Sequence, residues 1–256
     1  MPTAIRETTA KIRDLGLRDR ASAVGLGLGL PELVHPDDSL ANDWITDWNG
    51  RSPAIDLTGF EPVRVDSDVR LAALAELRYG HGRALPTFAF INIGSGLSYA
   101  FCQDGRIHRG AHGCAVYFAS SDLVTFNVAG GACDPFNLES RASGFCLARV
   151  YAARTGRVAT ARDIVEGRCG PTGEALLDQA TTALASYLRQ MVNMLDPHGV
   201  LFSGALGTAP GFFGRIQAKL PPYIWAEGCR EVPVLASALG ATAGVVGGAA
   251  LHLGHG

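Results

Sequence analysis

The chain lacks an excess of charge of either sign. Its 256 residues include 22 Lys and Arg against 24 Asp and Glu, which gives a formal net charge of −2. A general nucleic-acid binder carries a basic excess or stripe, so no nucleic-acid partner is expected. Charged residues make up only 18% of the chain and hydrophobic residues 47%. This balance excludes an acidic disordered chain and favours a packed core.

The sequence also lacks any Cys-x-x-Cys pair. Its six cysteines are scattered between Cys102 and Cys229, which does not signal a zinc site. Charged side chains interrupt the first twenty positions, so no secretory signal is expected there. The sequence therefore predicts reduced thiols in a cytoplasmic protein.

One run, 232–254, contains no Asp, Glu, Lys or Arg and is long enough to cross a bilayer. It holds Pro233, His252 and several glycines, which make it less apolar than a typical membrane-spanning helix. Gly240 and Gly244 form a small-xxx-small pair of the kind found in membrane dimers. The composition favours the alternative, a strand followed by a buried helix, and predicts no membrane partner.

Glycine is abundant, with 32 residues and no fixed period. Gly-rich turns between apolar runs are typical of an α/β protein whose backbone approaches a ligand closely. Hydrophobic periodicity predicts strands over 23–30, 62–65, 87–93, 97–102, 200–203 and 232–235. It predicts helices over 4–15, 69–79, 141–154, 160–167, 172–195, 211–219 and 237–252, with irregular chain over 35–60 and 110–140. Because strands alternate with helices, the predicted fold class is α/β.

The first place that can carry chemistry is the strand–helix junction Asp66-Ser67-Asp68. A carboxylate at such a junction can act as a general base on a substrate hydroxyl, as aspartates do in phosphoryl transfer. The alternative is that Asp66 or Asp68 only caps the helix. The residues alone favour the cap.

Two glycine-containing loops are the other candidates. The backbone amides of Gly94-Ser95-Gly96 can converge on an anion, although the motif matches neither a P-loop nor a dinucleotide fingerprint, and a plain tight turn is favoured. Gly204-Ala205-Leu206-Gly207 follows a buried strand, and ligands bind at the carboxyl ends of such strands. Its alternative is an ordinary β–α turn.

The order and spacing of these segments resemble the ROK family, which groups sugar kinases and sugar-responsive repressors on the actin-like, hexokinase-type fold. The stretch 65–76 is similar to the family's Asn-Asp-Ala-Asn-Ala-Ala-Ala-Leu-Ala-Glu segment, which places Asp68 at the catalytic base. Gly94-Ser95-Gly96 resembles the second phosphate motif. The stretch 138–144 resembles a sugar-contacting segment that includes Glu139, and 203–207 resembles a loop on the adenosine side.

The sequence departs from the family pattern in the sugar and zinc positions. Tyr117 stands where a sugar-binding Glu is usual, and Ser120 where a zinc-ligating His is usual. Ser67 replaces an Asn that contacts sugar hydroxyls. Of the family's cysteine cluster only Cys133 remains, and one cysteine cannot hold a tetrahedral zinc, so no structural zinc is predicted.

A further departure is that the family's Asp-x-Gly-Gly-Thr phosphate hairpin has no counterpart in this sequence. The resemblance therefore implies an actin-like ATPase (ribonuclease H-like) two-lobed fold with an incomplete N-terminal lobe. It implies an N-terminal lobe over 1–105, with the catalytic Asp and the phosphate hairpin, and a nucleotide-side lobe over 106–256. It also implies a homodimer, and without a helix-turn-helix segment no direct repressor activity is expected.

Several functions remain open. The first is a sugar kinase that uses ATP and Mg²⁺ to phosphorylate a hexose or amino sugar, with Asp68 as the base. Its expected substrate-binding residues are Ser67, Tyr117, Glu139 and His112, and its expected phosphate- and nucleotide-binding residues are Gly94, Ser95, Gly96, Gly204, Ala205, Leu206 and Gly207. The second is a pseudokinase that binds a sugar or a partner without phosphoryl transfer. The third is a cleft reused for other chemistry, with Tyr117, Asp68 or His112 as acid or base.

Overall fold

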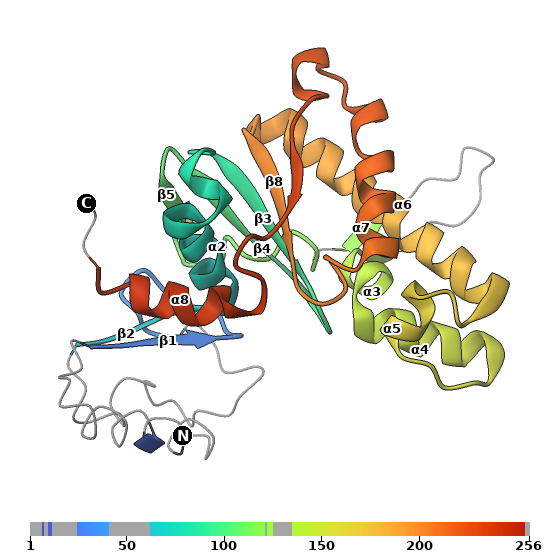
Figure 1. Cartoon of the computed structure of the whole chain (residues 1–256), viewed down its shortest axis with the longest axis horizontal. Coiled ribbons are helices and arrows are strands. Elements are labelled where there is room, and N and C mark those ends of the chain that lie inside the picture. Colours follow the sequence, from blue (N-terminus) through green and yellow to red (C-terminus); the bar gives the residue numbers. More distant parts are fainter. Residues whose placement is uncertain are drawn as a thin grey trace.

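The structure, a computed structural model, describes residues 7, 10, 11, 25–40, 62–120, 122–124 and 135–253. Its centre is a five-stranded sheet in the order β5-β4-β3-β8-β9 (Figure 1). The strands are β3 (Phe88–Ile93), β4 (Leu97–Gln103), β5 (Arg106–His108), β8 (Gly199–Ser203) and β9 (Val234–Ala236). Strand β4 runs antiparallel to β3 and β5, whereas β3, β8 and β9 run parallel to one another.

Helices cover both faces of this sheet (Figure 1). Phe88 and Phe90 of β3 belong to a core on the side of α2, whereas Ala89, Ile91 and Ile93 belong to a core on the side of α6 and α7. Covering both faces explains why β3 is an almost unbroken apolar run. The helices are α2 (Asp68–Tyr79), α3 (Glu139–Ala142), α4 (Gly144–Thr155), α5 (Ala161–Val165), α6 (Gly170–Leu195), α7 (Pro210–Lys219) and α8 (Ala243–Ala250).

A second, smaller unit lies beside the sheet. Strands β1 (Leu26–Leu30) and β2 (Val63–Ser67) pair in parallel, and α8 packs against both β1 and α2 (Figure 1). The approach needs glycine, because a Cβ on Gly247 would overlap the backbone of Leu71. Strand β9 and helix α8 thus confirm the prediction of a strand followed by a helix within 232–254. The helix is buried on one face only, because Val245 on its other face is 81% exposed. No helix in the part of the chain that the structure describes has both the length and the apolar character needed to cross a bilayer.

Two helix starts differ from the predictions for local reasons. Helix α8 begins at Ala243 instead of 237, because Ser237 Oγ and Leu239 N donate to a carboxylate oxygen of Glu76 and hold the chain in a turn. The helix predicted from 141 is divided, because Ser143 is extended and its hydroxyl caps α4 by accepting from Cys146 N.

Several predictions touch residues outside the described ranges. In the helix predicted over 4–15, only residues 7, 10 and 11 are described, and they are helical. Residues 41–60 of the predicted loop are not described. Within 110–140, predicted as irregular, short strands β6 (Asp122–Val124) and β7 (Pro135–Asn137) pair antiparallel. The central sheet takes strands from both sides of residue 105, and the division into lobes at that point stays a prediction.

Candidate functional site

Most of the predicted catalytic and substrate residues line one cavity of about 280 Å³, here called the Asp68 pocket. The cavity lies where the start of α2, the β3–β4 hairpin and the start of α3 meet. The predicted residues that line it are Ser67, Asp68, Gly94, Ser95, Gly96, Tyr117 and Glu139. Segments more than 70 positions apart in the sequence therefore share one site.

Asp68 is the first residue of α2, directly after the buried N-cap residue Ser67. One of its carboxylate oxygens accepts a hydrogen bond of 2.7 Å from Val69 N. The side chain is open to the solvent of the pocket but is otherwise surrounded by protein, and this partial desolvation raises the pKa of Asp68. A carboxylate in a cleft with a raised pKa has the character of a general base.

The hairpin Gly94-Ser95-Gly96 offers backbone amides to the pocket. Its own turn is closed by Gly94 N, which donates to Gly96 O at 3.0 Å. The carbonyls of Gly94 and Ser95 accept from Gly144 and Phe145 at the start of α4, at 2.9 and 3.1 Å. Among the described residues, nothing accepts from the amides of Ser95 and Gly96. Unpaired amides at a glycine turn are a binding place for an anion.

Glu139, at the start of α3, is attached to the same hairpin. Its Oε1 accepts a hydrogen bond of 3.1 Å from Leu97 N, the first residue of β4. A Cβ on Gly96 would lie 2.8 Å from that oxygen, so the glycine allows the carboxylate to approach. The other carboxylate oxygen has no hydrogen bond to any described residue, which leaves it available to a ligand.

A second cavity, of about 1050 Å³, lies on the other side of the hairpin. Gly94 and Ser95 line both cavities, and Ala205 and Leu206 line the second one; we call it the Ala205 pocket. Gly204 and Gly207 are not among its lining residues. They pack against the end of β3 instead, where Leu206 N and Gly207 N both donate to Ile93 O at 3.0 Å. Their predicted contact with a nucleotide stays a prediction.

Tyr117 and His112 have different surroundings. Tyr117 lies at the mouth of the Asp68 pocket, where burial and then the negative charges of Glu32, Glu139 and Asp68 raise the pKa of its hydroxyl. His112 is exposed and is not a lining residue of that pocket; its carbonyl accepts from His35. The structure therefore does not bring His112 together with the other predicted substrate residues.

Three polar lining residues were not predicted: Glu32, Asn92 and Ser98. Glu32 is 2% exposed and directly follows Pro31 at the end of β1. Asn92 donates to Ser98 Oγ at 3.3 Å across the β3–β4 ladder. For Glu32 and Asn92 the one sequence signal is a single polar residue near the end of an apolar strand; Ser98, near the start of β4, has no such signal.

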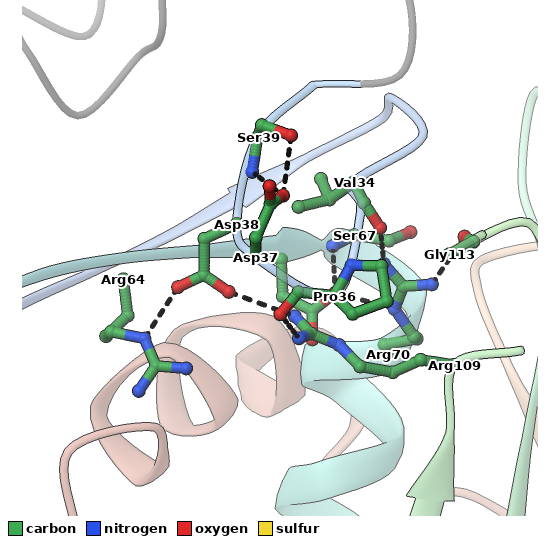
Figure 2. A network of polar contacts seen from close by, with 11 residues as sticks. Val34, Pro36, Asp37, Asp38, Ser39, Arg64, Ser67, Arg70, Arg109 and Gly113 are labelled. Carbon is green, nitrogen blue, oxygen red and sulfur yellow. Dashed lines mark hydrogen bonds and ion pairs between the residues drawn. The ribbon is translucent and has the colours of Figure 1, made fainter. Parts of the chain in front are cut away.

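A buried charge network supports the back of the site (Figure 2). Arg70 lies on α2, four positions after Asp66 of β2; it is 1% exposed, and its Nε donates to Asp66 Oδ1 at 2.6 Å. Its other nitrogens donate to the carbonyls of Gly113 and Val34 at 2.7 and 2.8 Å. Arg109 reaches the second oxygen of Asp66 at 2.9 Å. The network joins α2 to the loops that carry Glu32 and Tyr117.

Within the described ranges, no group of three or more His, Cys, Asp and Glu side chains lies close enough to hold a metal ion. Ser120, at the position of the family's zinc-ligating His, is exposed. Cys133 lies outside the described residues. The absence of a structural zinc stays a prediction from the sequence.

The mixed sheet, its helical layers and the two cavities that meet at one hairpin define an actin-like α/β protein. The chain belongs to the ROK family, whose model matches residues 2–255.

Among solved structures, the chain is similar to a ROK family glucokinase from Streptomyces griseus in complex with glucose and AMPPNP. The TM-score is 0.77 at 21% identity, covering 96% of this chain and 87% of that one. It is also similar to a ROK family protein from Streptococcus pneumoniae TIGR4 in complex with sucrose. There the TM-score is 0.78 at 22% identity, covering 99% and 87% of the two chains.

Among curated proteins, the chain is 31% identical over 188 residues to the bifunctional enzyme NanE/NanK of Brucella melitensis. The match covers 73% of this chain, which spans only 34% of the length of that relative. The chain is 24% identical over 221 residues to the beta-glucoside kinase of Listeria innocua, covering 82% of this chain and 74% of that relative. The second of these relatives is named as a kinase.

Proposed function

We propose that this protein transfers the γ-phosphoryl group of ATP to a hydroxyl of a hexose or amino sugar. The observation that carries the proposal is the position of the Gly94-Ser95-Gly96 hairpin between the Asp68 pocket and the Ala205 pocket. A sugar in the first pocket and a nucleotide in the second would meet at the unpaired hairpin amides. A homodimer in the cytoplasm remains part of this proposal, by resemblance to the family alone.

In this reaction the free carboxylate oxygen of Asp68 accepts the proton of the sugar hydroxyl. The hydroxyl oxygen forms a bond to the γ-phosphorus, and the bond from that phosphorus to the bridging oxygen of ADP breaks. The amides of Ser95 and Gly96 hold phosphate oxygens, and Glu139 accepts hydrogen bonds from sugar hydroxyls. Positioning and charge stabilisation of this kind supply most of the catalysis of phosphoryl transfer.

Magnesium fits this site as a partner of the nucleotide. The described residues offer single carboxylates instead of a closed ligand cage, and Mg²⁺ is usually held by one or two carboxylates together with substrate phosphates. When bound with ATP, Mg²⁺ offsets the negative charge of the phosphates.

A second function is a ROK-derived binding protein without phosphoryl transfer. The observation that favours it is the change at two of the family's sugar positions, which carry Ser67 and Tyr117 in this sequence.

An ADP-release assay with Mg²⁺–ATP separates the two functions. Relatives of this chain carry the names glucokinase and N-acetylgalactosamine, N-acetyl-D-glucosamine and N-acetylmannosamine kinase, so these four sugars form the first panel. We expect turnover with at least one sugar, and an Asp68→Asn variant about 10²- to 10⁴-fold slower. Asparagine keeps the acceptor for Val69 N, so the variant should still fold. Folded protein that gains thermal stability with a sugar but shows no turnover would establish the binding function instead.

A further inference from the structure

A third cavity, of about 670 Å³, lies along α2 from Arg70 to Tyr79 and shares no lining residue with the Asp68 pocket. Its other walls are β2, the β4–β5 turn with β5, and the end of α8, which packs beside α2 (Figure 1). Five arginines line it, from three separate parts of the chain: Arg64, Arg70, Arg78, Arg106 and Arg109. We call it the arginine cavity.

Two carboxylates, Asp66 and Asp38, pair with three of these arginines. Asp66 pairs with Arg70 and Arg109, and Asp38 pairs with Arg64 at 2.6 Å and with Arg109 at 3.4 Å (Figure 2). Arg70 is buried with all three guanidinium nitrogens engaged, so it contributes charge but no donor. Asp66 is the one carboxylate among the lining residues, which leaves an excess of positive charge around the cavity. The cavity therefore has an electrostatic preference for an anion.

Arg106 is the arginine best placed to meet a ligand. It is exposed on β5, and its guanidinium makes no hydrogen bond or ion pair with any residue that the structure describes. It lines both the arginine cavity and an adjoining open cavity of about 610 Å³, which also includes Arg109. A ligand held by Arg106 and Arg109 would thus lie at the junction of the two cavities.

We propose that the arginine cavity binds a small phosphate-bearing anion, at a site separate from the one proposed for phosphoryl transfer. Guanidinium groups present paired donors that match phosphate oxygens, and several of them around one cavity favour a polyanion over a single carboxylate. The volume lies within the range of small-molecule sites, about 300–1,000 Å³. Leu74, Leu77 and the half-exposed ring of Tyr79 supply an apolar wall for the rest of the ligand.

Isothermal titration of the full chain with pyrophosphate, orthophosphate and glucose 6-phosphate tests this proposal. We expect saturable binding of at least one of the three, weakened as salt rises. Whichever ligand binds most tightly shows whether a free phosphate or a phosphorylated metabolite is preferred. Arg106→Glu should weaken that binding at least tenfold, because it replaces a positively charged donor by a carboxylate that repels the anion. Arg157→Glu is the matched control, since it makes the same change of charge at an arginine that is also exposed and without a described side-chain partner, on a distant loop.

The phosphate hairpin is the competing place for such a ligand, so the experiment includes Gly94→Ala. Binding that is lost in Gly94→Ala but unchanged in Arg106→Glu would overturn the proposal, as would the absence of saturable binding to the wild-type protein. Binding that is lost in Arg106→Glu and kept in Gly94→Ala and Arg157→Glu supports it. Crystals soaked with tungstate give a direct readout, with heavy-atom density expected beside Arg106. None of these outcomes depends on sugar kinase activity.

Discussion

Glu139 Oε1 lies 3.1 Å from the backbone nitrogen of Leu97, 42 positions earlier in the sequence. The carboxylate at the start of α3 thereby holds the first residue of β4 and, with it, one end of the phosphate hairpin. Leu97 is 4% exposed, so its N–H has little access to water if this acceptor is removed. The bond makes Glu139 both a part of the proposed sugar site and a support of the hairpin.

Glu139→Ala should therefore destabilise the fold. It leaves a buried N–H without an acceptor, which costs about 1–3 kcal/mol. Glu139→Gln keeps an acceptor in the same place and should cost less than half as much. Urea unfolding of the two variants measures the difference, and equal losses for both would contradict the supporting role of this hydrogen bond.

Asp68→Asn should make the protein more stable at pH 7. Partial desolvation by the surrounding protein raises the pKa of Asp68 above its ordinary 3.8, so the ionised form is less favourable in the folded than in the unfolded state. Ionisation of Asp68 therefore lowers the free energy of unfolding as the pH rises from 3.8 through the raised pKa. The amide of the Asp68→Asn variant does not ionise, so the variant avoids that loss of stability. The advantage of the variant should shrink as the pH falls toward 3.8, which urea midpoints across that range measure.

Asp178→Asn is a control for which the expected change in stability at pH 7 has the opposite sign. Its hydrogen bond to Lys219 lowers the pKa of Asp178, so the carboxylate adds stability above its ordinary pKa and loses that effect as the pH falls. This variant should be less stable than the wild type at pH 7 and similar to it in acid. If both aspartate variants shift stability in the same direction at pH 7, the assignment of the Asp68 environment is wrong.

The pH dependence of activity follows from the same carboxylate, if Asp68 is the base. Only the ionised form accepts a proton, so kcat/KM should fall in acid. Since the pKa of Asp68 is raised, this fall should begin at a higher pH than for an ordinary aspartate. Initial rates at low sugar concentration across pH 4–8 check it, in a range where the protein is shown to be folded. A rate independent of pH down to 4 would exclude Asp68 as the base.

Gly94→Ala and Gly204→Ala should have contrasting effects. A Cβ on Gly94 meets nothing within 4 Å, so stability should change by no more than about 0.5 kcal/mol. The added methyl projects where phosphate would approach, and a crowding cost of about 1–3 kcal/mol raises KM for ATP about tenfold or more. Gly204 has φ of 82° and a Cβ there would overlap Ile93 O, so its variant should lose stability instead, by about 1–3 kcal/mol.

Urea unfolding and ATP titrations of these two glycine variants separate the roles. A Gly94→Ala variant with unchanged KM for ATP would exclude a phosphate contact at the hairpin. A Gly204→Ala variant as stable as the wild type would mean that the loop after β8 adapts to a side chain.

Glu76→Ala should be among the most destabilising substitutions in α2. Glu76 is fully buried, and its Oε1 accepts from Ser237 Oγ at 2.6 Å and from Leu239 N at 2.9 Å. Its Oε2 accepts from His81 N at 3.1 Å. Each hydrogen bond to a charged group contributes about 1.5–3 kcal/mol, so the loss should exceed about 3 kcal/mol. Ser237→Ala removes one donor only and should cost about 1–2 kcal/mol; an equal effect of the two substitutions in urea unfolding would contradict this account.

The apolar run of β3 and the turn after it could be predicted because their signals are local. An unbroken hydrophobic run followed by Gly94-Ser95-Gly96 predicts a strand and a tight turn in almost any surroundings. Arg70 shows the opposite case. An arginine in an Ala- and Leu-rich helix is expected to face water, yet Arg70 is buried because Asp66 and two carbonyls distant in sequence meet its guanidinium. No local pattern contains those partners.

The residues of the candidate site likewise divide into those that the sequence predicts and those that only the tertiary structure places. Asp68 and the hairpin are identified by motif resemblance, whereas Glu32 is not, because its place in the pocket depends on how the chain after β1 folds back toward Tyr117. His112 stands close to Tyr117 in the sequence and yet lies outside the lining residues of the pocket.

The sequence alone therefore determined most of the order of strands and helices, but not β6, β7 or the division between α3 and α4. It also determined the family and the choice of Asp68 as the proposed base, since these depend on periodicity and short motifs. The tertiary structure decided that Asp68, Glu139 and the hairpin share one cavity, and that five arginines share another. Such convergence comes from packing and from charges that find partners far along the chain, and these interactions exist only once the sheet and its helices are assembled.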